Sequence, residues 1–187
     1  MNLPNLITLA RLAAVPFTVW LIVDGYVMWA FWVFVAAGVS DALDGFIAKH
    51  FDMETELGKY LDPLADKALL VSVYVALGVE GHVASWLVIL VVFRDLLIIG
   101  GALLFETMTH SLTMQPLMIS KINTTVQIVF AAAVMAHVGF GIDLNGWVDS
   151  LVMTVLVLTT AATTVASGVA YAIEWIRRWA QLEEDQK

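Results

Sequence analysis

Six long apolar segments follow one another along the chain and constrain its fold more than any other feature. Each is close to the roughly 20 residues that a helix needs to cross the hydrocarbon core of a bilayer. Of the 187 residues, 60% are hydrophobic and only 14% are charged, which is too little charge for the surface of a soluble domain. We therefore expect an all-α membrane protein, with one domain over residues 1–187 and six transmembrane helices. The expected helices are Leu6–Val23, Val27–Ala48, Leu57–Val79, Val83–Phe105, Asn123–Phe140 and Trp147–Ile173.

The cations are unevenly distributed between the two ends of these segments. The loops around Asp24, Glu80 and Asp143 contain no Lys or Arg, whereas eight of the nine cations lie at or near the opposite ends. These eight are Arg11, Lys49, Lys59, Lys67, Lys121, Arg177, Arg178 and Lys187. The positive-inside rule then predicts a multi-pass protein with both termini and the cation-bearing ends in the cytoplasm. We expect the membrane to be a bacterial inner membrane. The net charge of −8 argues against nucleic acid as a partner.

Four aspartates stand within the apolar second and third segments. Asp41 and Asp44 are three residues apart, and Asp62 and Asp66 are four apart, so each pair shares one face of a helix. Carboxylates in such a setting are costly unless they are neutralised. Two pairs on neighbouring helices would supply the hard oxygen ligands that suit Mg²⁺ or Mn²⁺. The alternative, ordinary helix capping by aspartate, would not require the glycines and the alanine that lie between them.

The full pattern resembles the signature of the CDP-alcohol phosphotransferase family. It reads Asp41-x-x-Asp44-Gly45-x-x-Ala48-Lys49, then eight residues, then Gly58-x-x-x-Asp62-x-x-x-Asp66. Lys49 is the one departure, because the family usually has Arg there, and Lys lacks the bidentate fork of a guanidinium. The resemblance implies a six-helix bundle with a polar active-site cavity open to the cytoplasm. It also implies transfer of a phosphoalcohol group from a CDP-alcohol to a hydroxyl, with release of CMP.

The resemblance further assigns roles to individual residues. The four aspartates would hold two divalent cations, and Asp66 would also be the general base that takes the proton of the acceptor hydroxyl. The CDP group would lie against Asp44, Gly45, Ala48, Lys49 and Gly58, and against Asn5 and Thr8 of the first segment. The glycines suit this role independently, since a nucleotide can approach a backbone that carries no side chain.

Arg94 lies beside Asp95 near the middle of the fourth segment, where charged residues are rare and usually face a cavity. We expect Arg94 to bind a phosphate of the donor or the acceptor; the alternative is an ion pair that holds helices together. The other candidate contacts to the acceptor or its phosphate are Arg11, Lys121 and Asn123. For Arg11, the alternative is a side chain that snorkels from the start of an interfacial helix.

The start of the fifth segment resembles one branch of the family. Ser120-Lys121-Ile-Asn123-Thr124 is similar to the CMP-forming cardiolipin synthases, whereas phosphatidylglycerophosphate synthases tend to have Lys in place of Asn123. This resemblance implies CDP-diacylglycerol as donor and phosphatidylglycerol as acceptor, giving cardiolipin and CMP. The alternative acceptor is glycerol 3-phosphate, a dianion that favours an additional cation.

Two further interpretations remain open from the sequence. Aspartate and arginine within membrane segments also occur in ion or proton transporters, although a transporter would not need the spaced glycines of the motif. The small residues of Ala161–Gly168 suit close helix packing or a homodimer interface in the membrane.

Overall fold

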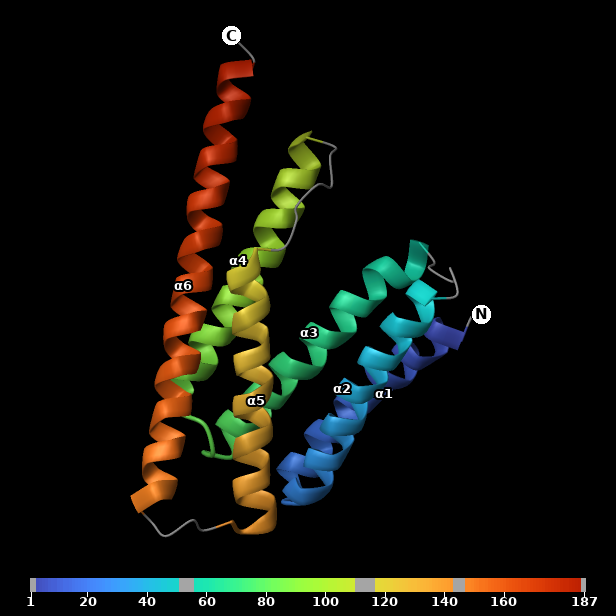
Figure 1. Cartoon of the computed structure of the whole chain (residues 1–187), viewed down its shortest axis with the longest axis vertical. Coiled ribbons are helices and arrows are strands. Elements are labelled where there is room, and N and C mark those ends of the chain that lie inside the picture. Colours follow the sequence, from blue (N-terminus) through green and yellow to red (C-terminus); the bar gives the residue numbers. More distant parts are fainter. Residues whose placement is uncertain (1–2, 51–55, 110–116, 143–146, 186–187) are drawn as a thin grey trace.

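The computed structural model describes residues 3–50, 56–109, 117–142 and 147–185, and these residues form six α-helices (Figure 1). Side chains are described for residues 7–41, 65–102, 117–142 and 150–177. The helices are α1 (Leu3–Val23), α2 (Val27–His50), α3 (Glu56–Val79), α4 (Ser85–Thr109), α5 (Met118–Phe140) and α6 (Trp147–Asp185).

The six expected segments correspond one to one with these helices, and the all-α class is confirmed. The largest difference is at α6, which continues to Asp185 instead of ending at Ile173. Its last turns are rich in charged residues, which lower the hydropathy without opposing a helix, because Glu, Gln, Arg and Leu are good helix formers. Likewise α5 begins at Met118, before Asn123, since the polar start of this helix hides its true beginning from a hydropathy argument.

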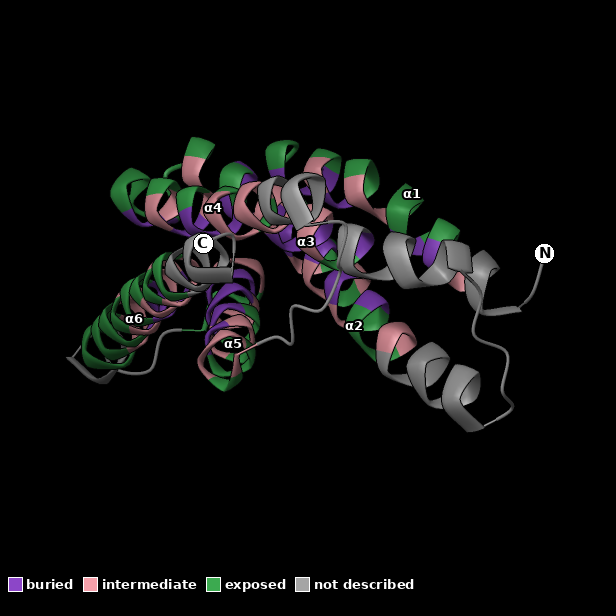
Figure 2. Ribbon diagram, turned by 90° about the horizontal axis from the view of Figure 1, so that it is seen from above, coloured by how far each residue is buried: buried purple, intermediate pink, exposed green. Residues whose placement is uncertain are grey.

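Among the described residues, three stretches are long and apolar enough to cross a membrane. They are Ser85–Ala102, Met118–Phe140 and Ser150–Arg177, and α1 and α2 contain the shorter apolar stretches Ile7–Val23 and Val27–Asp41. Exposed residues follow the outer faces of the helices (green in Figure 2), and many of them are large and apolar, with Trp29, Ile89 and Phe93 each more than half exposed. An apolar outer surface of this extent is what a lipid environment requires.

The helices form two groups. Helix α1 packs against α2 and α3, and α6 packs against α4 and α5, while contacts of α2 with α5 and of α3 with α4 and α5 join the groups. The buried core lies toward the end where α1 meets α2 and where α3 meets α4, and includes Ile22, Leu77, Leu87 and Met135. The two groups diverge toward the other end, where α2 ends and α3 begins (Figure 1).

One glycine makes close packing possible at the core end. A Cβ atom on Gly139 of α5 would lie 2.6 Å from the backbone nitrogen of Met28 at the start of α2. No side chain fits at that distance, so Gly139 lets the two backbones touch. This contact fixes α5 against α2 at one end, while the helices separate around the cavity described next.

Candidate active site

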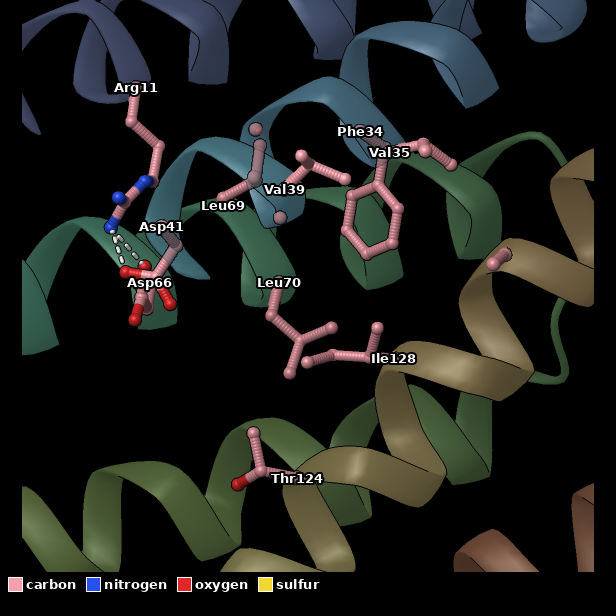
Figure 3. A pocket seen from close by; sticks show the side chains of 13 residues that line it. Arg11, Phe34, Val35, Val39, Asp41, Asp66, Leu69, Leu70, Thr124 and Ile128 are labelled. Carbon is pink, nitrogen blue, oxygen red and sulfur yellow. Dashed lines mark hydrogen bonds and ion pairs between the residues drawn. The ribbon is translucent and has the colours of Figure 1, made fainter. Parts of the chain in front are cut away.

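A cavity of about 520 Å³ lies between the two helix groups, and we call it the α2–α5 cavity (Figure 3). Its lining residues come from four helices and are Arg11, Phe34, Val35, Ala37, Gly38, Val39, Asp41, Asp66, Leu69, Leu70, Thr124, Ile128 and Ala132. Three charged side chains lie together at one end, and the rest of the wall is apolar apart from Thr124. The cavity can therefore take a molecule with a charged part and a long apolar part.

Arg11 of α1 brings together one aspartate from each half of the motif. Its Nη1 atom donates a hydrogen bond to Oδ1 of Asp66 at 2.6 Å and is paired with Oδ1 of Asp41 at 2.7 Å (Figure 3). The Arg11 side chain is only 2% exposed, whereas those of Asp41 and Asp66 are 41% and 45% exposed. The two carboxylates thus converge on a single cationic nitrogen while remaining accessible from the cavity.

The arrangement of these carboxylates bears on whether the motif residues could hold metal ions. Asp44 and Asp62 lie one turn from Asp41 and Asp66 on α2 and α3, but their side chains are outside the described residues. Among the side chains that the structure describes, no group of three or more possible metal ligands is found. Even so, two carboxylates aimed at one positive atom fit a cationic occupant, and carboxylate oxygens are the ligands that Mg²⁺ and Mn²⁺ prefer.

The residues expected around the CDP group are only partly within the described structure. Thr8 is 2% exposed and lies one helical turn before Arg11 on α1, but it is not among the residues that line the cavity. The side chains of Asn5, Gly45, Ala48, Lys49 and Gly58 lie outside the described residues. Their contacts with a nucleotide stay predictions.

Arg94 is buried between helices and does not line the α2–α5 cavity. Its Nη1 atom donates to Oδ1 of Asp95 at 2.6 Å, its Nε donates to Oγ of Ser167 at 3.1 Å, and its Nη2 donates to Oγ of Ser120 at 2.5 Å. The side chain is 2% exposed, so these contacts match the helix-holding alternative. Binding of a substrate phosphate by Arg94 stays a prediction.

The sequence interpretation assigned no role to Lys67 and considered Asp95 only as an ion-pair partner of Arg94. Lys67 of α3 donates a hydrogen bond from Nζ to Oδ1 of Asp95 at 2.9 Å, and the Asp95 side chain is 3% exposed. The position of Lys67 directly after the last motif aspartate was the signal that could have drawn attention to it. Which way Lys67 faces could not be read from spacing alone.

Asn123 is fully buried between α5 and α6 and is not itself among the residues that line the cavity, although the adjacent Thr124 is. Its Oδ1 atom accepts hydrogen bonds from the hydroxyls of Thr163 and Thr164, each at 2.9 Å. Gln127, one turn further along α5, was also missed and donates to Thr164 at 3.3 Å. Lys121, by contrast, is exposed at the start of α5. Contacts of Asn123 and Lys121 with an acceptor stay predictions.

Comparison with known proteins identifies the class of protein to which this fold and motif belong. The family described as CDP-alcohol phosphatidyltransferase matches residues 1–176. The chain is therefore a member of the CDP-alcohol phosphatidyltransferase family, and the resemblance stated from the motif is confirmed.

Individual relatives have two different names. The chain is 36% identical over 192 residues to the chloroplastic CDP-diacylglycerol–glycerol-3-phosphate 3-phosphatidyltransferase 1 of Oryza sativa subsp. japonica, with 94% of this chain and 57% of that protein covered. It is 32% identical over 186 residues to the CMP-forming cardiolipin synthases of Rattus norvegicus and Homo sapiens, with 91% of this chain and 60% of each relative covered. The chain thus spans somewhat more than half the length of these curated relatives.

Proposed function

We propose that this protein is a phosphatidyltransferase of phospholipid biosynthesis, which uses CDP-diacylglycerol as donor and a lipid hydroxyl as acceptor. The observation that carries the proposal is the convergence of Asp41 and Asp66 at the charged end of an otherwise apolar cavity. A donor with a charged diphosphate and two acyl chains matches this distribution of charge. Membership in the family supports the same reaction class.

The proposed reaction needs a base beside the phosphoryl group. The acceptor hydroxyl oxygen forms a bond to the phosphorus that carries diacylglycerol, and the bond from this phosphorus to the bridging oxygen of the diphosphate breaks. CMP leaves with the bonding electrons, and the hydroxyl proton passes to the carboxylate of Asp66. Asp66 suits this step because its side chain is 45% exposed toward the cavity, and because Arg11 orients it.

Divalent cations are part of the proposal. Asp41, Asp44, Asp62 and Asp66 would hold two Mg²⁺ or Mn²⁺ ions, with the first and last of these supported by their convergence on Arg11. Such ions supply positive charge for a diphosphate that must react beside an apolar membrane interior. The protein itself contributes the oxygen ligands, the base and the apolar wall.

We propose phosphatidylglycerol as the acceptor, which makes cardiolipin the product. Among the described residues that line the cavity, Arg11 is the one cation, and it is already paired with two carboxylates. Arg94 is enclosed by its own partners, and Lys67 is paired with Asp95. This arrangement suits a monoanionic diester better than a dianionic monoester, which needs more positive charge. The relatives named cardiolipin synthase are consistent with this choice.

The second candidate is a phosphatidylglycerophosphate synthase with glycerol 3-phosphate as acceptor. The observation that favours it is the 36% identity to the rice phosphatidyltransferase over 94% of this chain. Both candidates share the donor, the motif and the release of CMP, so they differ only in what approaches Asp66.

We also propose that all six helices cross a bacterial inner membrane, with both termini and the motif on the cytoplasmic side. Three long apolar helices support a membrane location, and the uneven distribution of Lys and Arg supports the orientation. A homodimer stays part of the proposal. Within the chain, Thr164 and Ser167 of the small-residue stretch are already buried against α5 and α4.

The deciding experiment offers both acceptors at once. Purified protein in mixed micelles with Mg²⁺ or Mn²⁺ receives labelled CDP-diacylglycerol and equal amounts of phosphatidylglycerol and glycerol 3-phosphate. Cardiolipin with stoichiometric CMP is the expected result. Phosphatidylglycerophosphate alone would refute the acceptor and retain the family reaction, whereas no cation-dependent CMP release would refute the reaction itself.

A further inference from the structure

We propose that Lys67 and Asp95 are positioning residues, which fix the turn of α3 that carries Asp66. This inference rests on the proposed function, because it concerns how the proposed base is held at the cavity. Neither side chain is among those that line the cavity. Their effect on the reaction would therefore pass through the backbone of α3.

Asp95 is the anchor of the arrangement. Its carboxylate is 3% exposed, and the same oxygen, Oδ1, accepts hydrogen bonds from Nη1 of Arg94 at 2.6 Å and from Nζ of Lys67 at 2.9 Å. Arg94 is in turn held by Ser167 of α6 through both Nε and Nη2 and by Ser120 of α5 through Nη2. The carboxylate is thus fixed in place by contacts that reach three helices of one group.

Lys67 connects Asp95 to the turn of α3 that carries the motif residue Asp66. Consecutive residues on an α-helix point about 100° apart, because one turn contains 3.6 residues. Asp66 accordingly pairs with Arg11 of α1, while the adjacent Lys67 pairs with Asp95 of α4. One turn of α3 is therefore held from two sides, by α1 across the first helix group and by α4 of the second.

The location of the Lys67–Asp95 ion pair gives this pair a role beyond general stability. The hydrophobic core continues along α3 as far as Ala65, Leu69 and Leu70, and beyond this turn the two helix groups diverge (Figure 1). The Lys67–Asp95 ion pair lies where the helix groups begin to diverge, so it acts together with this apolar packing to set the position of the turn that carries Asp66. A displacement of about 1 Å at a reacting group can lower the rate by roughly 100-fold.

The test compares Lys67→Met with Lys67→Arg. Methionine keeps the apolar stem of the lysine side chain and removes the ion pair with Asp95. Asp95 still pairs with Arg94, so no buried charge is left without a partner. Arginine retains a donor for Asp95. The control is Arg177→Met, which removes an exposed cation of α6 far from these contacts. The measurements are kcat, KM for CDP-diacylglycerol, Mn²⁺ affinity and the Tm in detergent.

We expect Lys67→Met to lower kcat by about 10- to 100-fold, the range seen when a residue that orients a metal ligand is lost. The KM for CDP-diacylglycerol should stay within twofold and the Tm should stay close to wild type. Lys67→Arg should recover most of the activity. The double variant Lys67→Met/Asp95→Asn should lose no more activity than Asp95→Asn alone, because the two residues act as one unit.

Three results would overturn the inference. An unchanged kcat would show that Asp66 does not depend on the Lys67–Asp95 ion pair. A parallel loss of kcat and Tm in both Lys67 variants would show that the ion pair only stabilises the fold. Additive losses in the double variant would show that the residues act separately. If wild-type protein releases no CMP, the reaction fails but the positioning remains testable. Lys67→Met should then still weaken Mn²⁺ binding about tenfold relative to Arg177→Met, and equal affinities would refute it.

Discussion

Replacing Arg11 with glutamine should tighten the binding of a divalent cation while lowering catalysis. In the present structure the guanidinium occupies the space between Asp41 and Asp66, with Nη1 at 2.7 Å and 2.6 Å from their Oδ1 atoms. A cation that uses these oxygens must displace the guanidinium or share the site with a like charge. In either case the positive charge of Arg11 lowers the affinity for the divalent cation, and glutamine removes this charge.

The size of the effect follows from the exposure of the two carboxylates. Because Asp41 and Asp66 are 41% and 45% exposed, each pair with Arg11 is worth what an exposed ion pair is worth, about 0.2–1 kcal/mol. Two pairs then contribute roughly 0.4–2 kcal/mol. At 1.4 kcal/mol for each factor of ten, the Mn²⁺ affinity of Arg11→Gln should rise by about 2- to 30-fold.

The assay is a titration of detergent-solubilised protein with Mn²⁺, in which the free ion is counted by its EPR signal at constant ionic strength. Arg177→Gln carries the same substitution at an exposed position of α6 and should bind Mn²⁺ as wild type does. CMP release by Arg11→Gln should fall, because Asp66 loses the contact that orients it. Weaker Mn²⁺ binding by Arg11→Gln would refute the competition, since it would mean that Arg11 helps to build the cation site.

Two further substitutions test the base and the packing. Asp66→Asn should lower CMP release by at least about 10²- to 10⁴-fold while labelled CDP-diacylglycerol still binds, as measured by equilibrium binding; a rate near wild type would assign the proton to another group. Gly139→Ala should destabilise the protein by about 1–3 kcal/mol, because its Cβ would lie 2.6 Å from the backbone of Met28. Gly100→Ala is the matched control, with nothing within 4 Å of its Cβ, and equal Tm values for the two variants would show that α5 shifts freely.

Much of the fold was predictable because hydropathy and helix formation depend on local sequence. Six apolar segments became six helices, and α3 keeps the expected end at Val79. The ends that were predicted poorly are those rich in charge, as in α6 after Ile173. There the sequence is no longer apolar but still favours a helix. Hydropathy therefore predicts an earlier end to the helix than helix propensity does.

The candidate site was predictable only in part. Motif spacing correctly indicated that Asp41 and Asp66 would approach each other across two helices. Spacing did not reveal that Arg94 would be enclosed by Asp95 and the serines of two other helices. The direction in which a helical side chain points relative to its neighbours is set by tertiary packing, which a single sequence does not contain.

The distribution of charge around Asp66 links these features. Four motif carboxylates carry four negative charges, and Arg11 can balance only one of them. The cation of Lys67 is directed to Asp95, so it does not contribute to this balance. Two divalent cations would exceed the remaining negative charge by one, which leaves the site positive and suited to the diphosphate of the donor. Asp95 of α4 holds the cation of Lys67 away from Asp66. In doing so, Asp95 both positions the proposed base and keeps the motif carboxylates available for metal ions. In this interpretation, the cations and the nucleotide lipid complete the site together, while Arg11 continues to balance one of the four carboxylates.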